Sequence, residues 1–224
     1  MKKIIFSIII LLLFLQVCFA QNTGVIQKVL KNNPTQGYVL LLPRKYTAEN
    51  KAPLLIVIHW YQGTAIQQID EWKFFAQKNG YILLSPQFGE GYQRLEGGQE
   101  QKLKDIISEV ENEYSVDHDR IFLVGFSGGA QFAHRFAYRN RFLRAVCILS
   151  PGDCDSPPSE PSAKSVRYFV GVGEKDPRYP VAKKLYNLLK KKGYEVTFES
   201  FPLVGHVLHS NMKSAAMDFF NSCP

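Results

Sequence analysis

The feature of this 224-residue chain that most limits its fold is the alternation of short apolar runs with segments of helical period. Eight runs have the length of β-strands. Six of them are near-continuous stretches of Val, Ile, Leu and Phe, as in parallel strands covered on both faces. The eight runs are residues 25–30, 38–42, 54–59, 81–85, 121–125, 145–149, 168–172 and 196–200.

Five segments with helical periodicity follow or separate the later runs, at residues 68–78, 99–114, 128–138, 180–192 and 210–221. This alternation predicts an α/β protein whose mostly parallel, doubly wound sheet of about eight strands carries helices on both faces. The first two runs are separated by Asn32, Asn33 and Pro34, which favours an antiparallel hairpin at the sheet edge. Ligands of such sheets bind beyond the carboxyl ends of the strands, so functional residues are expected directly after them.

The first 20 residues have the pattern of a secretory signal peptide. Lys2 and Lys3 precede an apolar run over residues 4–15, and small residues at Cys18 and Ala20 predict cleavage after Ala20. The run is shorter than a membrane-spanning helix, which needs roughly 20 residues, so no stable membrane insertion is expected. We expect a secreted or periplasmic protein with one domain over residues 21–224. Lipidation of Cys18 is the alternative, although Val17 stands where lipoproteins have a small residue.

Charge and cysteine content add two expectations. The net charge of +7 is a mild excess, and the lysines between residues 183 and 192 fit the solvated face of one helix, so no nucleic-acid partner is expected. Cleavage would leave Cys147, Cys154 and Cys223, an odd number that keeps at least one thiol free. Cys147 lies in an apolar run and is expected to be buried. A bridge between Cys154 and Cys223 is disfavoured, because the expected topology separates them to opposite ends of the sheet.

Ser127 is the candidate nucleophile. It lies in the segment Gly125-Phe126-Ser127-Gly128-Gly129, which follows an apolar strand and opens a helix rich in small residues. The Gly-x-Ser-x-Gly pattern alone is weak, but between a strand and a helix it is typical of a sharp turn that lifts a serine hydroxyl above the sheet. The positive end of the helix would lie near the anion that forms during attack. The alternative is a glycine-rich turn with a bystander serine.

Two backbone N–H groups are candidate oxyanion donors. One is that of Gly128, directly after the nucleophile, and the other comes from the loop after the third strand, at Tyr61 or Trp60. Trp60 stands where glycine is commoner, and it would be strained if the loop required a positive φ there. His59 is expected to hold this loop in place rather than to act in catalysis.

A nucleophilic serine needs a histidine to take its proton and a carboxylate to orient that histidine. Asp176 follows the seventh apolar run and His206 follows the eighth, in the chain order serine, acid, histidine. The alternatives are Asp153 or Glu174 for the acid and His209 for the base. His118 and His134 are expected to be surface or packing residues.

Several segments resemble one esterase group. Residues 116–130, Ser85-Pro86-Gln87, Gly173-Glu174-Lys175-Asp176 and Gly205-His206 are similar to segments of carboxylesterases such as polyhydroxybutyrate depolymerases, feruloyl esterases and dienelactone hydrolases. The resemblance runs from Leu40 to the C-terminus. It implies an α/β-hydrolase fold and cofactor-free cleavage of carboxylic esters by Ser127, Asp176 and His206. The departures are Trp60 and a short region between Gly152 and Ser165, which leaves little material for a lid and predicts an open, shallow cleft.

The sequence predicts a secreted serine esterase that forms an acyl-enzyme. The partner expected is a small or polymer-linked ester, with an aryl, acetyl or polymer-derived group; no metal ligand set is expected, and the sequence carries no signal for an oligomeric state. A secreted peptidase of the same fold and a non-catalytic binding protein on this scaffold are the alternative functions. The residues expected to rim the cleft and bind substrate are Trp60, Tyr61, Phe88, Tyr92 and Gln131.

Overall fold

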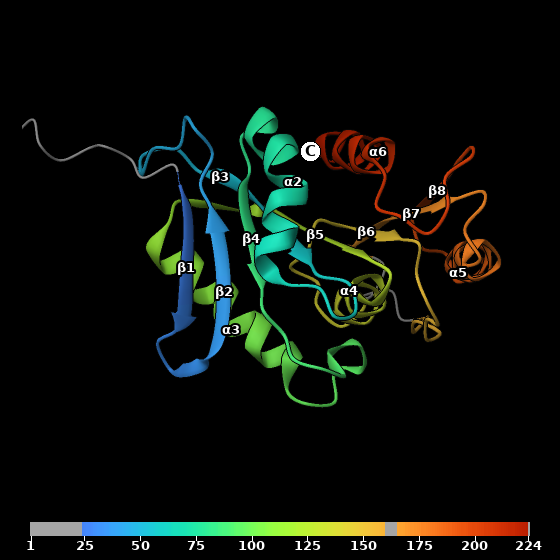
Figure 1. Cartoon of the computed structure of the whole chain (residues 1–224), viewed down its shortest axis with the longest axis horizontal. Coiled ribbons are helices and arrows are strands. Elements are labelled where there is room, and N and C mark those ends of the chain that lie inside the picture. Colours follow the sequence, from blue (N-terminus) through green and yellow to red (C-terminus); the bar gives the residue numbers. More distant parts are fainter. Residues whose placement is uncertain (1–23, 160–164, 224) are drawn as a thin grey trace, which may run out of the picture.

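The computed structural model describes residues 24–159 and 165–223, so the predicted signal peptide, residues 1–20, lies outside the described residues. Within the described ranges the strands form one eight-stranded sheet in the order β1-β2-β4-β3-β5-β6-β7-β8 (Figure 1). The strands are β1 (Val25–Leu30), β2 (Asn33–Leu41), β3 (Ala52–Ile58), β4 (Ile82–Pro86), β5 (Val116–Phe126), β6 (Ala145–Leu149), β7 (Arg167–Gly173) and β8 (Val196–Phe201).

The strand directions confirm the fold class. β1 pairs with β2 antiparallel, and β2 runs antiparallel to β4. All pairings from β4 across to β8 are parallel. The sheet therefore has the antiparallel edge hairpin that Asn33-Pro34 predicted, followed by a doubly wound parallel region.

Helices cover both faces of the sheet. α2 (Ala65–Asn79) and α6 (Ser210–Asn221) contribute to an apolar cluster on one face. α3 (Gln99–Glu113), α4 (Gly128–Ala137) and α5 (Tyr179–Lys191) contribute to a second cluster on the other face. Strand β3 shows how both clusters arise: Leu54, Ile56 and Ile58 join one cluster, while Leu55 and Val57 join the other. Successive strand side chains point to opposite faces, so a continuous apolar run supplies both layers.

Three elements begin well before their expected first residues, and one of them is β2, which begins at Asn33 rather than near residue 38. α2 begins at Ala65 rather than near residue 68, because Thr64 and Gln67 form a capping box that satisfies first-turn N–H groups. β5 begins at Val116 rather than near residue 121, and Val116 pairs with Ala52 across a register shift. The polar stretch at the start of β5 carries no apolar signal, so periodicity alone does not reveal it as a strand.

The sheet topology has a switch point between β3 and β5, where a ligand-binding crevice is expected. The chain leaves β3 through α2 toward β4 on one side, and leaves β5 through α4 toward β6 on the other. Loops that diverge from neighbouring parallel strands leave a crevice at the carboxyl edge of the sheet. The loop after β3 and the turn after β5 flank this crevice. In the part of the chain that the structure describes, no helix is both long and apolar enough to span a bilayer.

Candidate active site

The turn between β5 and α4 holds Ser127 in a backbone conformation that L-residues rarely adopt, with φ 55° and ψ −116°. Its N–H donates to the Leu149 carbonyl oxygen at 3.0 Å, which ties the turn to β6. A Cβ on Gly129 would lie 2.7 Å from the His59 carbonyl oxygen, and one on Gly125 would lie 2.6 Å from the Ala130 nitrogen. The two glycines therefore let α4 pack directly against β5 and β3, which projects the serine from the sheet edge.

Ser127, His206 and Asp176 form one hydrogen-bonded row. His206 Nε2 lies 3.0 Å from Ser127 Oγ. On the other side of the ring, Nδ1 lies 2.9 Å and 3.1 Å from the two carboxylate oxygens of Asp176. Each residue comes from a different loop at the carboxyl edge of the sheet, after β5, β8 and β7 respectively.

The surroundings of the row fix its geometry. The Asp176 side chain is 0% exposed, whereas that of His206 is 33% exposed. The Arg178 N–H donates to Asp176 Oδ1 at 2.8 Å, so backbone as well as histidine holds the carboxylate. The Phe126 ring packs against the His206 ring with centroids 4.9 Å apart. A buried carboxylate that accepts from Nδ1–H leaves Nε2 unprotonated and facing the serine hydroxyl.

The backbone of Tyr61 lies close to Gly128, the residue after the serine. Gly128 is the first residue of α4, so its N–H has no partner inside the helix. A Cβ on Gly128 would lie 3.0 Å from the Tyr61 nitrogen, so the loop after β3 reaches the turn through Tyr61 rather than Trp60. Among the described residues the Tyr61 N–H donates to no carbonyl oxygen. The positive φ of this loop falls on Gln62, at 61°, and not on Trp60, so the expected strain at the tryptophan is absent.

A cleft of about 570 Å³ opens over the row. Trp60 and Tyr61 line it as expected, together with residues that the sequence did not single out: Glu71, Phe126, Val207 and Leu208. Tyr61 is 52% exposed and Val207 is 54% exposed, in agreement with an open cleft. The region expected to leave little material for a lid is described only in part, since residues 160–164 lie outside the described residues.

Phe88 and Tyr92 do not rim the cleft, which corrects the sequence prediction. They are 4% and 1% exposed, and both pack against neighbouring rings in the core, including Phe132 of α4. The Tyr92 hydroxyl donates to the His59 carbonyl oxygen. Both residues follow β4, but Tyr92 is the buried residue of the 3₁₀ turn Tyr92–Arg94, and Phe88 is buried beside it.

Gln131 also lies away from the cleft lining. Its side-chain nitrogen donates to the Asp153 carbonyl oxygen at 3.0 Å, and the same side chain fills the space beside Gly152. It therefore holds the loop after β6 against α4. Gln93 was not expected near the site, yet its side-chain nitrogen would lie 3.2 Å from a Cβ on Gly128.

The alternative acids and bases occupy other positions. Asp153 and Glu174 are exposed, and Glu174 accepts from Ser200 Oγ at 3.0 Å. His209 caps α6, where its Nδ1 accepts from the Asn211 N–H at 3.2 Å. Neither carboxylate is bonded to His206, so the row that the structure brings together is the one expected first.

The other histidines have structural surroundings. His59 is 2% exposed; its Nε2 accepts from the Phe88 N–H and its Nδ1 faces the Trp60 carbonyl oxygen. Burial lowers the pKa of His59, so the ring is neutral and holds the loop after β3, as expected. His134 is buried within α4, and His118 is exposed on the surface beside Glu111.

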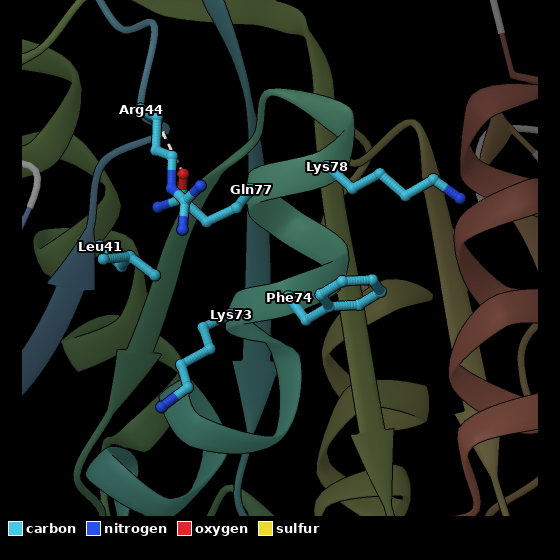
Figure 2. A pocket seen from close by; sticks show the side chains of 6 residues that line it. All are labelled: Leu41, Arg44, Lys73, Phe74, Gln77 and Lys78. Carbon is cyan, nitrogen blue, oxygen red and sulfur yellow. Dashed lines mark hydrogen bonds between the residues drawn. The ribbon is translucent and has the colours of Figure 1, made fainter.

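A second cavity, of about 600 Å³, lies on the outer side of α2 (Figure 2). Its lining includes Arg44, Lys73, Phe74 and Lys78, and the Arg44 N–H donates to Gln77 Oε1 at 2.7 Å. It is slightly larger than the cleft over Ser127, but it contains no nucleophile with an adjoining base. Size alone therefore does not identify the site.

The described cysteines form no disulfide bond. Cys147, Cys154 and Cys223 are all free, and Cys147 is buried as expected. Burial raises the pKa of the Cys147 thiol well above its usual range, so it stays protonated and unreactive. Among residues 24–159 and 165–223, no group of three or more His, Cys, Asp or Glu side chains is arranged to hold a metal ion.

Relatives of known sequence point to esterases. Probable feruloyl esterase C of Aspergillus niger is 28% identical over 156 residues, 64% of this chain and 56% of that protein. The bifunctional acetylxylan esterase/xylanase of Neocallimastix patriciarum is 31% identical over 88 residues, 37% of this chain and 13% of that protein. Probable feruloyl esterase C of Aspergillus oryzae is 26% identical, over 46% of its length. The chain thus spans about half, or less, of the curated relatives it matches.

Solved structures agree on the fold. The poly(3-hydroxybutyrate) depolymerase from Bordetella parapertussis superimposes with a TM-score of 0.72 at 18% identity, over 90% of both chains. S-formylglutathione hydrolase from Staphylococcus aureus gives a TM-score of 0.72 at 14% identity, over 88% of this chain and 97% of that one. The dienelactone hydrolase family model matches residues 23–218. The chain therefore belongs to the dienelactone hydrolase family, an esterase and serine hydrolase family of the α/β-hydrolase fold.

Proposed function

We propose that the protein is a serine carboxylesterase in which Ser127 is the nucleophile, His206 the general base and Asp176 the acid that orients it. The observation that carries this proposal is the continuous row of hydrogen bonds from Ser127 Oγ through His206 to the buried Asp176 carboxylate. Packing does not require these three residue types at the ends of three separate strands, whereas acyl transfer by a serine does.

The proposed reaction has two halves. Ser127 Oγ attacks the ester carbonyl carbon while His206 Nε2 takes the hydroxyl proton. The tetrahedral intermediate collapses, the C–O bond to the alcohol breaks, and His206 returns the proton to the departing alcohol. Water then attacks the acyl-enzyme by the same route, which releases the carboxylic acid and restores Ser127. Asp176 stabilises the imidazolium that forms in each half.

The oxyanion of the intermediate would accept from the N–H groups of Gly128 and Tyr61. Support comes from the approach of the Tyr61 nitrogen to Gly128 and from the position of Gly128 at the start of α4. Donors that are already in place stabilise developing charge without reorganisation, and each is worth roughly a hundredfold or more in kcat. A ligand that contacts both would be held over Ser127.

For the substrate we propose an aryl, acetyl or polymer-derived ester. The aromatic residues Trp60 and Tyr61 at the cleft suit a flat or apolar acyl group, and the exposure of the cleft would admit an ester attached to a larger molecule. The relatives named as feruloyl and acetylxylan esterases support the same class.

The decisive experiment is labelling with a fluorophosphonate probe, which reacts with activated serines. Wild type should be labelled and Ser127→Ala should not. Ser150→Ala is the matched control, because Ser150 also follows a strand and has a positive φ, of 45°, but is buried without contact to His206. Labelling of Ser127→Ala would show that Ser127 is not the nucleophile. Hydrolysis of peptide anilides without hydrolysis of p-nitrophenyl acetate would favour a peptidase instead.

We also propose export, followed by removal of residues 1–20. The support is the sequence of the leader itself, Lys2-Lys3 followed by an apolar run and Ala20. The exported protein should begin at Gln21 in N-terminal sequencing or intact mass. A lipid-modified chain beginning at Cys18 would instead show the lipoprotein alternative.

A further inference from the structure

Among the described residues, the lining of the cleft over Ser127 includes one carboxylate. Glu71 of α2 lines the cleft, among walls formed by Trp60, Tyr61, Phe126, Val207 and Leu208. Apart from Ser127 and His206, the other described lining residues are aromatic or aliphatic. A single charged group in an apolar cleft determines which polar substituents of a ligand can be accommodated there.

Lys213 of α6 holds the Glu71 carboxylate in place. The Lys213 ammonium donates to Glu71 Oε2 at 2.6 Å and to the Glu71 carbonyl oxygen at 3.2 Å. The Lys213 side chain is 10% exposed and its ammonium lies 5.7 Å from the centre of the Phe75 ring. The ammonium is thus enclosed by α2 and α6, and the carboxylate has a defined position.

The carboxylate itself remains open to the cleft. The Glu71 side chain is 38% exposed, against 10% for its partner. Among the described residues Oε1 accepts no hydrogen bond, while Oε2 is taken by Lys213. Glu71 therefore offers an acceptor oxygen to a ligand in the cleft, whereas the Lys213 ammonium, a donor, is not part of the cleft lining.

We propose that Glu71 determines substrate specificity by accepting a hydrogen bond from a hydroxyl group of the ester substrate. This inference rests on the proposed esterase function. A carboxylate that accepts from a neutral hydroxyl forms a charge-assisted hydrogen bond, stronger than one between neutral groups. It repels a substrate that carries its own carboxylate. The preferred class is accordingly uncharged, hydroxylated esters, such as hydroxyaryl or sugar esters.

The test measures kcat/KM for two pairs of esters that differ by one hydroxyl. Methyl p-coumarate and methyl cinnamate differ on the acyl side, and ethylene glycol monoacetate and ethyl acetate differ on the alcohol side. In wild type, at least one hydroxylated ester should be preferred over its partner. Glu71→Leu should reduce that preference about tenfold or more, because the hydroxyl loses a charged acceptor. If Glu71→Leu has the same hydroxyl preference as wild type for both pairs of esters, the proposal is overturned.

A second arm separates recognition from a purely structural ion pair. Glu71→Gln removes the charge at nearly constant shape, so hydrolysis of monomethyl terephthalate should rise several-fold relative to methyl benzoate. An ion pair that only joins α2 to α6 predicts no such gain. Lys213→Met tests the positioning role: it should lower the hydroxyl preference, with the carboxylate still present. Unaltered selectivity in Glu71→Gln would contradict electrostatic discrimination.

Controls keep this inference distinct from the proposed function. Asp70→Asn alters the neighbouring acid, which pairs with Lys73 at 2.8 Å and is absent from the cleft lining, so both preferences should persist. Melting temperatures show that each variant is folded. If wild type hydrolyses none of the esters and takes no fluorophosphonate label, the esterase proposal fails. If it hydrolyses them but Glu71 substitutions leave selectivity unchanged, the specificity proposal alone fails.

Discussion

The Asp176 side chain has no solvent contact, and both of its carboxylate oxygens face His206 Nδ1. Asn at this position would keep the shape but replace one acceptor oxygen with a donor, which favours the wrong tautomer of the imidazole. We expect Asp176→Asn to lower kcat for p-nitrophenyl acetate by about 10⁴-fold, with KM nearly unchanged, on the pattern of serine protease triads. Steady-state kinetics measures this. A loss of less than tenfold would mean that the carboxylate does not orient the base.

His206 has the larger role, because it both takes and returns the proton. His206→Ala should lower kcat by several orders of magnitude, somewhat more than Asp176→Asn does, and it should leave the far-ultraviolet circular dichroism unchanged. His209→Ala is the control, because His209 only caps α6 through the Asn211 N–H. Retained turnover in His206→Ala would assign the base elsewhere.

For single residues, the sequence predicts those site residues whose position depends only on where a strand ends. Ser127, Asp176 and His206 each lie in the turn or loop after a parallel strand, so topology alone places them at one edge. Phe88 and Tyr92 follow the same rule but point inward, because local turn geometry decides direction. Glu71 has no sequence signal: it is one of several polar residues on α2, and only the packing of α6 selects it for the cleft.

Among the elements, the contact of α4 with the sheet depends on two glycines. A methyl group on Gly129 would overlap the carbonyl oxygens of Ile58 and His59, which belong to β3 and its loop and cannot move independently. Gly129→Ala should therefore lower the free energy of unfolding by about 2 kcal/mol or more, in the range of overpacked cores. Urea denaturation measures the loss. Gly89→Ala is the control: a Cβ there meets nothing within 4 Å, so a comparable loss would show that steric overlap is not the cause.

α4 also carries a buried histidine that titrates on unfolding. Burial lowers the pKa of His134 to about 4 from an ordinary 6.5, although its Nε2 faces the Asp155 carbonyl oxygen at 2.8 Å. Between these pH values the unfolded chain binds a proton that the folded chain does not. The free energy of unfolding should therefore fall as the pH drops from about 6.5 to about 4, by roughly 3 kcal/mol from this group.

Urea midpoints across that pH range test the titration. His134→Gln keeps an N–H donor but cannot titrate, so it should flatten the slope. A wild-type stability that does not vary between these pH values would contradict the assignment.

The strands and their order along the chain could be predicted from the sequence, because most strands of a doubly wound sheet are apolar runs. All eight expected strands overlap those observed. The differences lie at element ends, where hydrogen bonding rather than hydrophobicity decides. β5 continues through the polar residues Asp117, His118 and Asp119, and the periodicity of side chains carries no information on backbone pairing of that kind.

For the whole molecule, one sheet joins two apolar clusters, so neither face can be lost without exposing the other. We propose that residues 21–224 form one domain and expect one cooperative unfolding transition. Trp60 and Trp72 both belong to the face covered by α2 and α6, so tryptophan fluorescence reports on that face alone. Circular dichroism reports on all helices. Coincident urea midpoints from the two probes would support one unit, whereas separate midpoints would indicate that the faces unfold independently.

The proposed general base lies in the loop after a strand at the edge of the sheet. His206 follows β8, which among the described strands pairs with β7 alone and largely alternates half-buried with exposed side chains. Terminal strands open at lower free energy than central ones, whereas Ser127 follows β5 near the middle of the sheet. Mild urea should thus abolish turnover while tryptophan emission and ellipticity are still native. Inactivation would then be a reversible fraying event, and the working range of the enzyme would be set by its outermost strand.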